Sequence, residues 1–305
     1  MEELLRQYMN LYYIQVLTLI CIMMIAALGL HLITGVTGQL SFGHAAFVGI
    51  GAYAAALSNI HWGLPFLICV LLGGLAAALA GVLVGFPSMR LTGDYLGIAT
   101  LGFAEIVRVI LMNMDITGGA RGLAGIPRET TLVLAFVLAA VAIWTMYRIQ
   151  DSRFGRALVA IREDDIAAEC NGINGLWYKV SAFAIGSFFA GVAGGLYAHF
   201  LQYLNPSGFG FAKSFEILTF VVLGGLGSIP GTVLGTTILT LLPEVLRFSA
   251  EYRMMMYGLL MVIMMIFRPR GLLGGVDLLP LLKRMLYSLR KKQTPLNGDG
   301  NGRSV

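Results

Sequence analysis

The sequence predicts an all-α integral membrane protein of about eight transmembrane segments, including broken or re-entrant half-helices. Of its 305 residues, 57% are hydrophobic and 12% are charged. Soluble domains carry about 25% charged residues, so this chain has too few to cover a surface in water. The 39 glycines lie inside apolar runs, where small residues let helix backbones approach each other closely in lipid.

A helix needs about 20 mostly apolar residues to span a bilayer. The segments that meet this description are 12–33, 40–60, 64–86, 95–114, 131–150, 176–201, 214–247 and 253–268. The stretch 214–247 exceeds one crossing and is interrupted by Gly224, Gly225, Gly227 and Pro230. Proline removes a backbone donor, glycine is a poor helix former, and unpaired backbone cannot face lipid. We therefore predict two half-helices here, a re-entrant pair or two short crossings, and a similar break in 34–44.

Basic residues favour the cytoplasmic side of a membrane. The regions 148–179 and 268–303 together hold 13 of the 21 lysines and arginines, so both are predicted to be cytoplasmic. An even number of crossings must then join them, whereas the side of the N-terminus stays open. We divide the chain into a transmembrane domain, residues 1–275, and a basic, partly disordered cytoplasmic tail, residues 276–305.

The loop 151–175 is the most informative polar part of the sequence. Residues 157–169 contain neither glycine nor proline, which predicts a helix. Its apolar face would carry Leu158, Ile161 and Ile166, and its charged face Arg162, Glu163 and Asp165. Such a helix can lie on the membrane surface, dock in a groove of a partner protein, or be a solvated connector. The pattern alone leaves these three interpretations open.

Two polar positions stand out inside the apolar segments. Glu105 and Arg108 are spaced to pair on one helix face near the middle of 95–114, where charge is costly. His44 lies close to Gln39 and Ser41 in a glycine-rich stretch. Each position has two interpretations: a structural contact, or a polar group facing a passage or a partner subunit.

Enzyme signatures are missing from the sequence. It contains no Gly-x-x-x-x-Gly-Lys-[Ser/Thr] nucleotide loop, no His-Glu-x-x-His and no Gly-x-Ser-x-Gly with plausible partners. The three cysteines follow no disulfide or metal-binding spacing. We expect no catalytic residues, no metal site and no bound cofactor in this chain.

Several motifs in order resemble one family. They are residues 35–53, which include Gly38-Gln39-Leu40-Ser41-Phe42-Gly43-His44, and residues 93–106, 117–122, 154–172 and 224–228. Together they resemble the branched-chain amino acid ABC permeases of the LivM type. Ala167-Ala168 and Gly172 also resemble the Glu-Ala-Ala-x-x-x-Gly loop of ABC importer permeases, with Ile166 in place of the leading Glu.

The resemblance implies a bacterial inner-membrane importer in which the 151–175 loop couples this chain to ATPases. Its partners would be a second, LivH-like permease, two ATP-binding subunits (LivG- and LivF-like) that bind ATP and Mg, a periplasmic binding protein and membrane lipid, but no nucleic acid. The implied coupling residues are Arg156, Ala157, Ile161, Arg162, Glu163, Asp164, Ala167, Ala168 and Gly172.

The candidate pathway residues are Gly38, Gln39, Ser41, Gly43, His44, Glu105, Gly224, Gly225 and Gly227. A branched-chain amino acid suits an apolar passage, but the family also includes permeases for urea and short amides. A stand-alone secondary transporter is the less favoured alternative, because Glu105 and Arg108 are its only obvious intramembrane charges.

Overall fold

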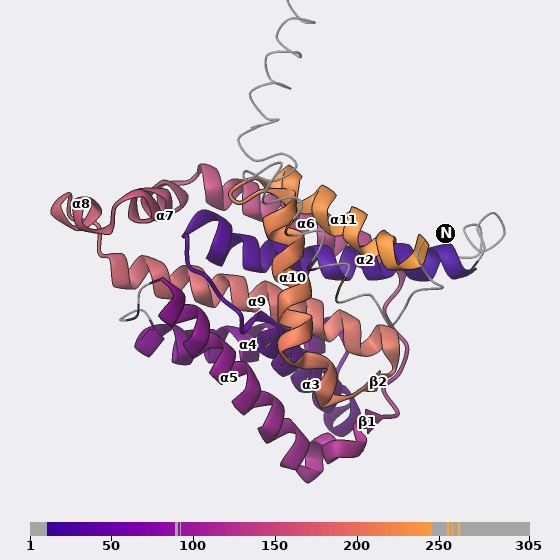
Figure 1. Ribbon diagram of the computed structural model, residues 1–305. Coiled ribbons are helices and arrows are strands. Elements are labelled where there is room, and N and C mark those ends of the chain that lie inside the picture. The colour runs from indigo at the N-terminus through magenta and orange to yellow at the C-terminus, as the bar shows by residue number, and fades with distance from the viewer. Residues whose placement is uncertain are drawn as a thin grey trace, which may run out of the picture.

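The computed structural model describes residues 11–88, 91 and 93–245, with isolated residues 255, 258 and 262. The tail 276–305 therefore lies outside the described residues, as does nearly all of the predicted segment 253–268. The described part is helical apart from one two-residue strand pair, so the all-α class is confirmed (Figure 1).

Six helical spans in the described ranges are long and apolar enough to cross a membrane. They comprise α2 (Leu11–Leu30) with its π-helical continuation η1 (His31–Val36), α4 (Phe66–Ser88), α5 (Asp94–Asn113), α6 (Leu132–Asp151), α9 (Gly175–Leu201), and α10 (Phe211–Gly224) with the preceding 3₁₀ turn η4 (Pro206–Phe209). Two further helices, α3 (His44–Trp62) and the shorter α11 (Ile229–Val245), complete the bundle. Both predicted interruptions are confirmed, since helix stops at Val36 and Gly224 and resumes at His44 and Ile229.

Helix α9 is the centre of the bundle and packs against α2, α3 and α4. These helices meet at glycines: Gly191 lies against Gly51 and Gly73, and Gly194 against the Val48 carbonyl. At none of these glycines is there room for a Cβ atom. Large side chains including Phe47, Phe183 and Leu196 fill the surrounding core with at most 2% exposure. The sequence-based prediction that glycine serves close helix packing is thus confirmed.

The two ends of the bundle differ. At one end, two short helices, α7 (Arg153–Glu163) and α8 (Asp165–Cys170), project beyond the long helices (Figure 1). At the other end lie the 3₁₀ turns η2 (Asp115–Thr117) and η3 (Gly119–Arg121) and an antiparallel pair of strands. Strand β1 (Leu123–Ala124) pairs with β2 (Tyr203–Leu204), with Leu123 opposite Leu204. We refer to these as the α7 end and the β end.

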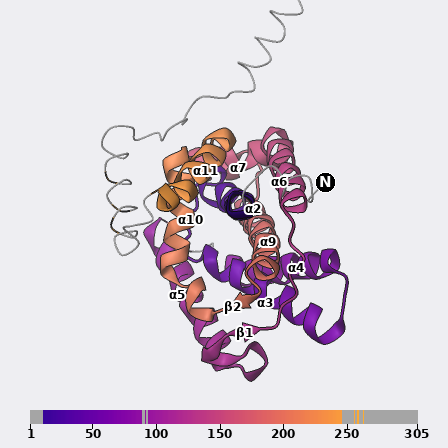
Figure 2. The same ribbon diagram turned by 90° about the vertical axis from the view of Figure 1, so that its right-hand side faces the viewer.

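The helices are not all aligned. α2 and α9 run along the bundle in Figure 1 and are seen nearly end-on in Figure 2, whereas α10 crosses them in both views. Helix α10 packs against α2 and α11. The residues between η1 and α3, numbers 37–43, form no helix. They pass from the end of η1 into the interior (Figure 1), and we call them the strap.

Candidate functional site

The projecting helix α7 is fastened to the bundle at its start. Ser152 caps it, because its hydroxyl accepts a hydrogen bond from the Gly155 N–H at 3.2 Å. The Phe154 ring packs against Trp177 and Tyr178 at the start of α9, with centroid distances of 6.2 and 5.4 Å. Leu158 is fully buried. The inner face of α7 is therefore held by packing.

The predicted single helix over 157–169 is wrong, since the chain breaks at Asp164. This residue has extended backbone, with φ −157° and ψ 108°, and its Oδ1 accepts from the Ala167 N–H at 2.9 Å. It therefore ends α7 and caps α8, as aspartate commonly does at helix starts. The break also turns Ile166 away from the buried face. Ile166 is 77% exposed, whereas Ile161 is 4% exposed.

The chain after α8 turns sharply at Gly172, whose φ of +81° favours glycine. The Ile173 N–H donates to the Ala168 carbonyl at 3.1 Å, which closes the end of α8. Ala168 is buried and Ala167 is exposed. Of the predicted coupling residues, Ala157, Ile161 and Ala168 face inward, and the exposed ones are Arg156, Arg162, Glu163, Asp164, Ala167 and Gly172.

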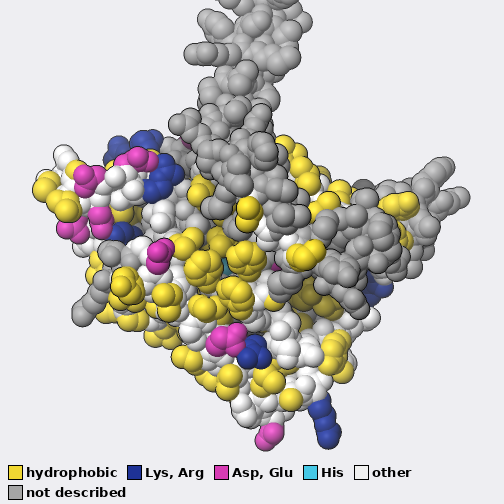
Figure 3. Space-filling view, in the orientation of Figure 1, with side chains coloured by type: hydrophobic (Ala, Val, Ile, Leu, Met, Phe, Trp, Pro, Cys, Tyr) yellow, Lys and Arg dark blue, Asp and Glu magenta, His cyan; other side chains and the backbone are white. Residues whose placement is uncertain are grey.

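A cleft of about 360 Å³ separates α7 and α8 from the strap and the start of α5. Its walls include residues 37–40 on one side and 161–165 on the other, with Asp94 and Lys179 between them. Lys179 on α9 pairs with Asp165 on α8 at 2.5 Å. Charged side chains gather over the projecting helices, whereas apolar side chains are spread over the long helices beside them (Figure 3). The α7 end therefore carries the densest group of charged side chains on this face.

The strap is held inside the bundle by side chains from other helices. The Phe42 N–H donates to Thr100 Oγ1 on α5 at 3.0 Å. Just beyond the strap, the Ala45 N–H donates to Ser214 Oγ on α10 at 3.0 Å. Neither Thr100 nor Ser214 was identified from the sequence. The only available signal was a hydroxyl residue within an apolar segment, and such residues are common in membrane helices.

The predicted pathway residues of the strap region are mostly buried. Ser41 and His44 are fully buried, Gln39 is 7% exposed, and Gly43 lies against the Thr100 backbone. His44 Nε2 forms a hydrogen bond with the Ala26 carbonyl of α2 at 2.9 Å. Gly38, in contrast, is exposed at the α7 end. These residues thus follow one path from the α7 end into the interior.

The turn between α10 and α11 also lies at the α7 end. Gly225 and Gly227 have φ values of +116° and +84°, and Gly224 lies against Gly231 as the two helices fold back on each other. Gln150 Nε2 at the end of α6 donates to the Gly227 carbonyl at 3.1 Å. A Cβ atom on Gly35 would lie 3.0 Å from the Gly227 nitrogen, so this turn lies against the last turn of η1, just before the strap, although the two are far apart in sequence.

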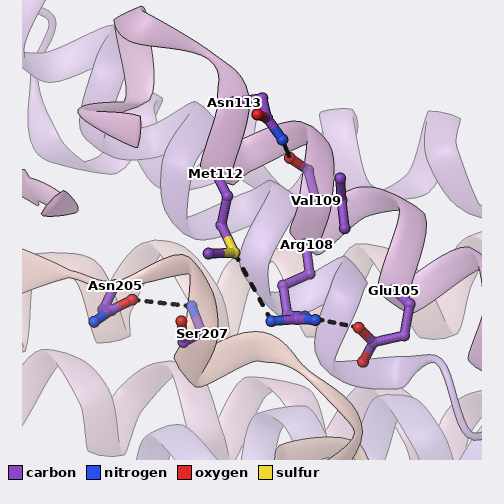
Figure 4. Close-up of polar contacts among 7 residues, drawn as sticks. All are labelled: Glu105, Arg108, Val109, Met112, Asn113, Asn205 and Ser207. Atoms are coloured by element: carbon purple, nitrogen blue, oxygen red, sulfur yellow. Dashed lines mark hydrogen bonds and ion pairs between the residues drawn. The ribbon is translucent and has the colours of Figure 1, made fainter. Parts of the chain in front are cut away.

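The predicted pairing of Glu105 with Arg108 is confirmed. Arg108 Nε lies 2.7 Å from Glu105 Oε2, and its Nη1 approaches Met112 Sδ at 3.8 Å (Figure 4). The Glu105 side chain is 39% exposed and the Arg108 side chain 32%, and both border Gly210 at the start of α10. This pair is therefore separate from the strap and the α7 end.

A further ion pair lies within α10 and was not predicted from the sequence. Lys213 Nζ lies 3.1 Å from Glu216 Oε2 within α10, and the side chains are 18% and 15% exposed. The predicted segment began at 214, which left Lys213 outside it, although the i, i+3 spacing was the same as that of Glu105 and Arg108. Within the described ranges, no group of three or more His, Cys, Asp or Glu side chains is arranged to hold a metal ion.

The sequence was also compared with known protein families. Residues 12–265 match the family described as branched-chain amino acid transport system, permease component. The chain belongs to this family. The resemblance proposed from the ordered motifs is thereby confirmed.

Individual relatives include both permease types of one system. The chain is 39% identical over 295 residues to the high-affinity branched-chain amino acid transport system permease protein LivM of Escherichia coli, covering 85% of this chain and 69% of the relative. It is 28% identical over 278 residues to BraD of Pseudomonas aeruginosa, covering 81% and 90%. It is 27% identical over 278 residues to LivH of Escherichia coli, with the same coverage. No solved structure matches the chain significantly.

Proposed function

We propose that this permease-family chain is the membrane-spanning subunit of an ATP-driven importer for branched-chain amino acids, and that α7 and α8 couple it to separate ATPase subunits. The second permease would be LivH-like, and a periplasmic binding protein would deliver the substrate across a bacterial inner membrane. The chain itself would hold no ATP, since its sequence lacks the phosphate-binding loop.

The observation that carries this proposal is the exposed apolar surface of α8. Ile166 is 77% exposed on a helix that projects beyond the bundle, while Leu158 and Ile161 fasten its neighbour α7. An exposed isoleucine beside Asp164 and Glu163 suits docking in a protein groove better than insertion among lipid chains. This favours one of the three interpretations left open by the sequence.

The test is reconstitution with candidate ATPase subunits. We expect Ile166→Glu to abolish co-purification of the ATPases, because it places a charge in the docking surface. The matched control is Ile116→Glu in η2 at the β end, where the isoleucine is 52% exposed. Equal co-purification with both variants would contradict the proposed role of α8, as would full-rate uptake by the chain reconstituted alone.

The substrate is tested by competition uptake on the assembled transporter. Leucine, isoleucine and valine should compete with one another for ATP-dependent uptake, whereas urea should not. Competition by urea or a short amide instead would assign the transporter to the alternative substrate class.

The Glu105–Arg108 pair extends the proposal to the passage. The pair lies near the middle of an apolar span with about a third of each side chain exposed, and such charge is costly in hydrocarbon. We propose that the second permease or the substrate passage covers this side of α5. Glu105→Gln should reduce uptake while both permeases still assemble; loss of assembly would instead support a structural role.

A further inference from the structure

Arg162 is unusual among the charged residues of α7 because its side chain reaches into the bundle. Its Nη1 donates to the Gly35 carbonyl at 2.9 Å, a contact between positions 127 residues apart. Gly35 is buried in the last turn of η1. A guanidinium suits this position, because carbonyls at a helix C-terminus lack partners and carry partial negative charge.

Gly38 is shaped around the same side chain. Its φ of +76° strains any residue with a Cβ atom, and the Arg162 methylene groups occupy the place that a Cβ atom would take. The stem of Arg162 therefore covers the first part of the strap. A larger residue at position 38 would displace the arginine.

The α10–α11 turn meets Arg162 from another side. A Cβ atom on Gly227 would lie 3.3 Å from Arg162 Nη1. The remaining guanidinium nitrogens, Nε and Nη2, donate to Glu163 Oε1 at 3.2 and 2.7 Å. Glu163 thus orients the planar group, so that Nη1 points to the joint between η1, the strap and the α10–α11 turn.

Beyond this joint the strap is held by separate hydrogen bonds to other segments. The Thr37 N–H and Oγ1 donate to the Leu32 carbonyl at 3.2 and 2.9 Å. The Gln39 N–H donates to the Ile33 carbonyl at 3.1 Å, and the Phe42 N–H is bound by Thr100. No regular helix or sheet ladder fixes residues 37–43. Movement of α7 can therefore reach the interior through Arg162 and the strap without deforming the glycine-packed helices α3, α4 and α9.

We propose that Arg162 is a positioning residue that links α7 to the strap and transmits ATPase-driven movement to the interior of the permease. This inference rests on the proposed coupling role of α7 and α8. It assigns Arg162 a function toward its own chain in addition to any contact with an ATPase.

The first experiment uses the complete transporter in proteoliposomes. Arg162→Ala should lower amino acid uptake per ATP hydrolysed by about fivefold or more, a typical size for coupling between sites. Co-purification of the ATPases is measured in parallel, so that the ratio counts only the ATP that bound subunits hydrolyse. Arg162→Lys should be less severely affected, since it keeps the stem over Gly38 and the charge. Arg153→Ala removes an exposed charge from the same helix and should leave the uptake-to-ATP ratio unchanged.

A second experiment follows the strap directly, with and without the Arg162 side chain. Leu40→Cys in a Cys170→Ser background, which removes the exposed native thiol, reports access to the strap by its rate of maleimide labelling. ATP with vanadate should change this rate in the wild-type arginine background and not in Arg162→Ala.

Different outcomes would contradict the role of Arg162 and the proposed function of the chain. An unchanged uptake-to-ATP ratio in Arg162→Ala would overturn the inference, as would a labelling rate at residue 40 that ignores nucleotide in a transporting wild-type complex. Failure of the wild-type chain to bind or respond to any ATPase would instead overturn the proposed function.

Discussion

The α4–α9 contact and the strap are held in opposite ways. Between α4 and α9, Gly73 and Gly191 bring backbones into direct contact, and side chains such as Phe183 fill the space around them. The strap touches other backbone at Gly43, which lies against Thr100. Elsewhere separate hydrogen bonds hold it: the Thr37 and Gln39 N–H groups donate to carbonyls of η1, and the Phe42 N–H donates to Thr100 Oγ1. Arg162 binds the adjoining Gly35 carbonyl.

This difference indicates where the chain can change shape. A close-packed interface has many simultaneous contacts and resists displacement, whereas one hydrogen bond contributes about 1 kcal/mol net and can be exchanged. We therefore regard α3, α4 and α9 as a frame and the strap with α7 as the movable part.

The largest loss of stability is expected from a substitution in the frame, helices α3, α4 and α9. Gly194→Ala adds a Cβ atom against the Val48 carbonyl and the Ala52 nitrogen, which belong to the α3 backbone. Overpacking costs about 1–3 kcal/mol and occasionally more, and backbone cannot move aside as a flexible side chain can. The thermal unfolding midpoint of the purified chain should fall strongly, and the yield of folded protein with it.

Gly102→Ala is the matched control for the frame. Gly102 lies within α5, and a Cβ atom there meets nothing within 4 Å. Its unfolding midpoint should equal or exceed that of the wild type, because alanine favours helix. Equal losses in both variants would show that the contact of a Cβ atom with the α3 backbone does not set the cost at Gly194, since alanine favours helix at both positions.

An intermediate loss of stability, together with a loss of uptake per ATP, is expected from a substitution where the strap meets α5. Thr100→Val keeps the shape of a fully buried side chain but leaves the Phe42 N–H without its acceptor, which should cost about 2 kcal/mol. Uptake per ATP should fall along with stability, since the strap loses a fixed point. The control is Thr145→Val, which removes a hydroxyl bonded to Val141 within α6. If uptake per ATP is the same in the two variants, the strap is not the movable part.

Much of the fold follows from local features of the sequence. Apolar length identified the long helices, and clustered Gly and Pro located the break after Gly224, because both residues disfavour helix wherever they occur. The Glu105–Arg108 pair was predictable because its geometry depends only on an i, i+3 spacing. Each of these features can be predicted from a few residues that are neighbours in the sequence.

The remainder depends on contacts that no local pattern contains. Arg162 meets Gly35 across 127 residues, and the Ala45 N–H meets Ser214 across 169. The sequence identifies a glycine such as Gly38 as a helix break. It does not show that the side chain of an arginine from another helix packs against it. Helices α7 and α8 do lie in the polar loop singled out from the sequence, while the contact of Arg162 with Gly35 was missed; the coupling role of this loop stays a prediction.

The break at Asp164 is an instructive exception, because it is local and was still missed. Residues 157–169 contain no glycine or proline, and helix propensity alone favours continuity. Aspartate, however, competes with the helix by bonding a backbone N–H with its own carboxylate, and Asp164 does so with Ala167. A capping residue within a helical run was the signal that would have predicted two helices.

The smallest loss of stability is expected from removing the Asp164 cap of α8. Asp164→Ala should destabilise α8 by about 1 kcal/mol, which corresponds to roughly fivefold in a local opening equilibrium. Hydrogen–deuterium exchange of the amides in 167–170 should accelerate accordingly, while exchange in α7 and α9 stays unchanged. Global unfolding should barely shift, since α8 contributes little to the core.

Two matched variants separate the cap from its charge. Asp164→Asn keeps a capping side chain of similar strength and should exchange at nearly the wild-type rate. Glu169→Ala removes an acidic group from the other end of the same helix and should not accelerate exchange, since negative charge is unfavourable near a helix C-terminus. If the asparagine variant exchanges as fast as Asp164→Ala, the carboxylate charge rather than the hydrogen bond to Ala167 stabilises α8. The break between α7 and α8 would then need another cause.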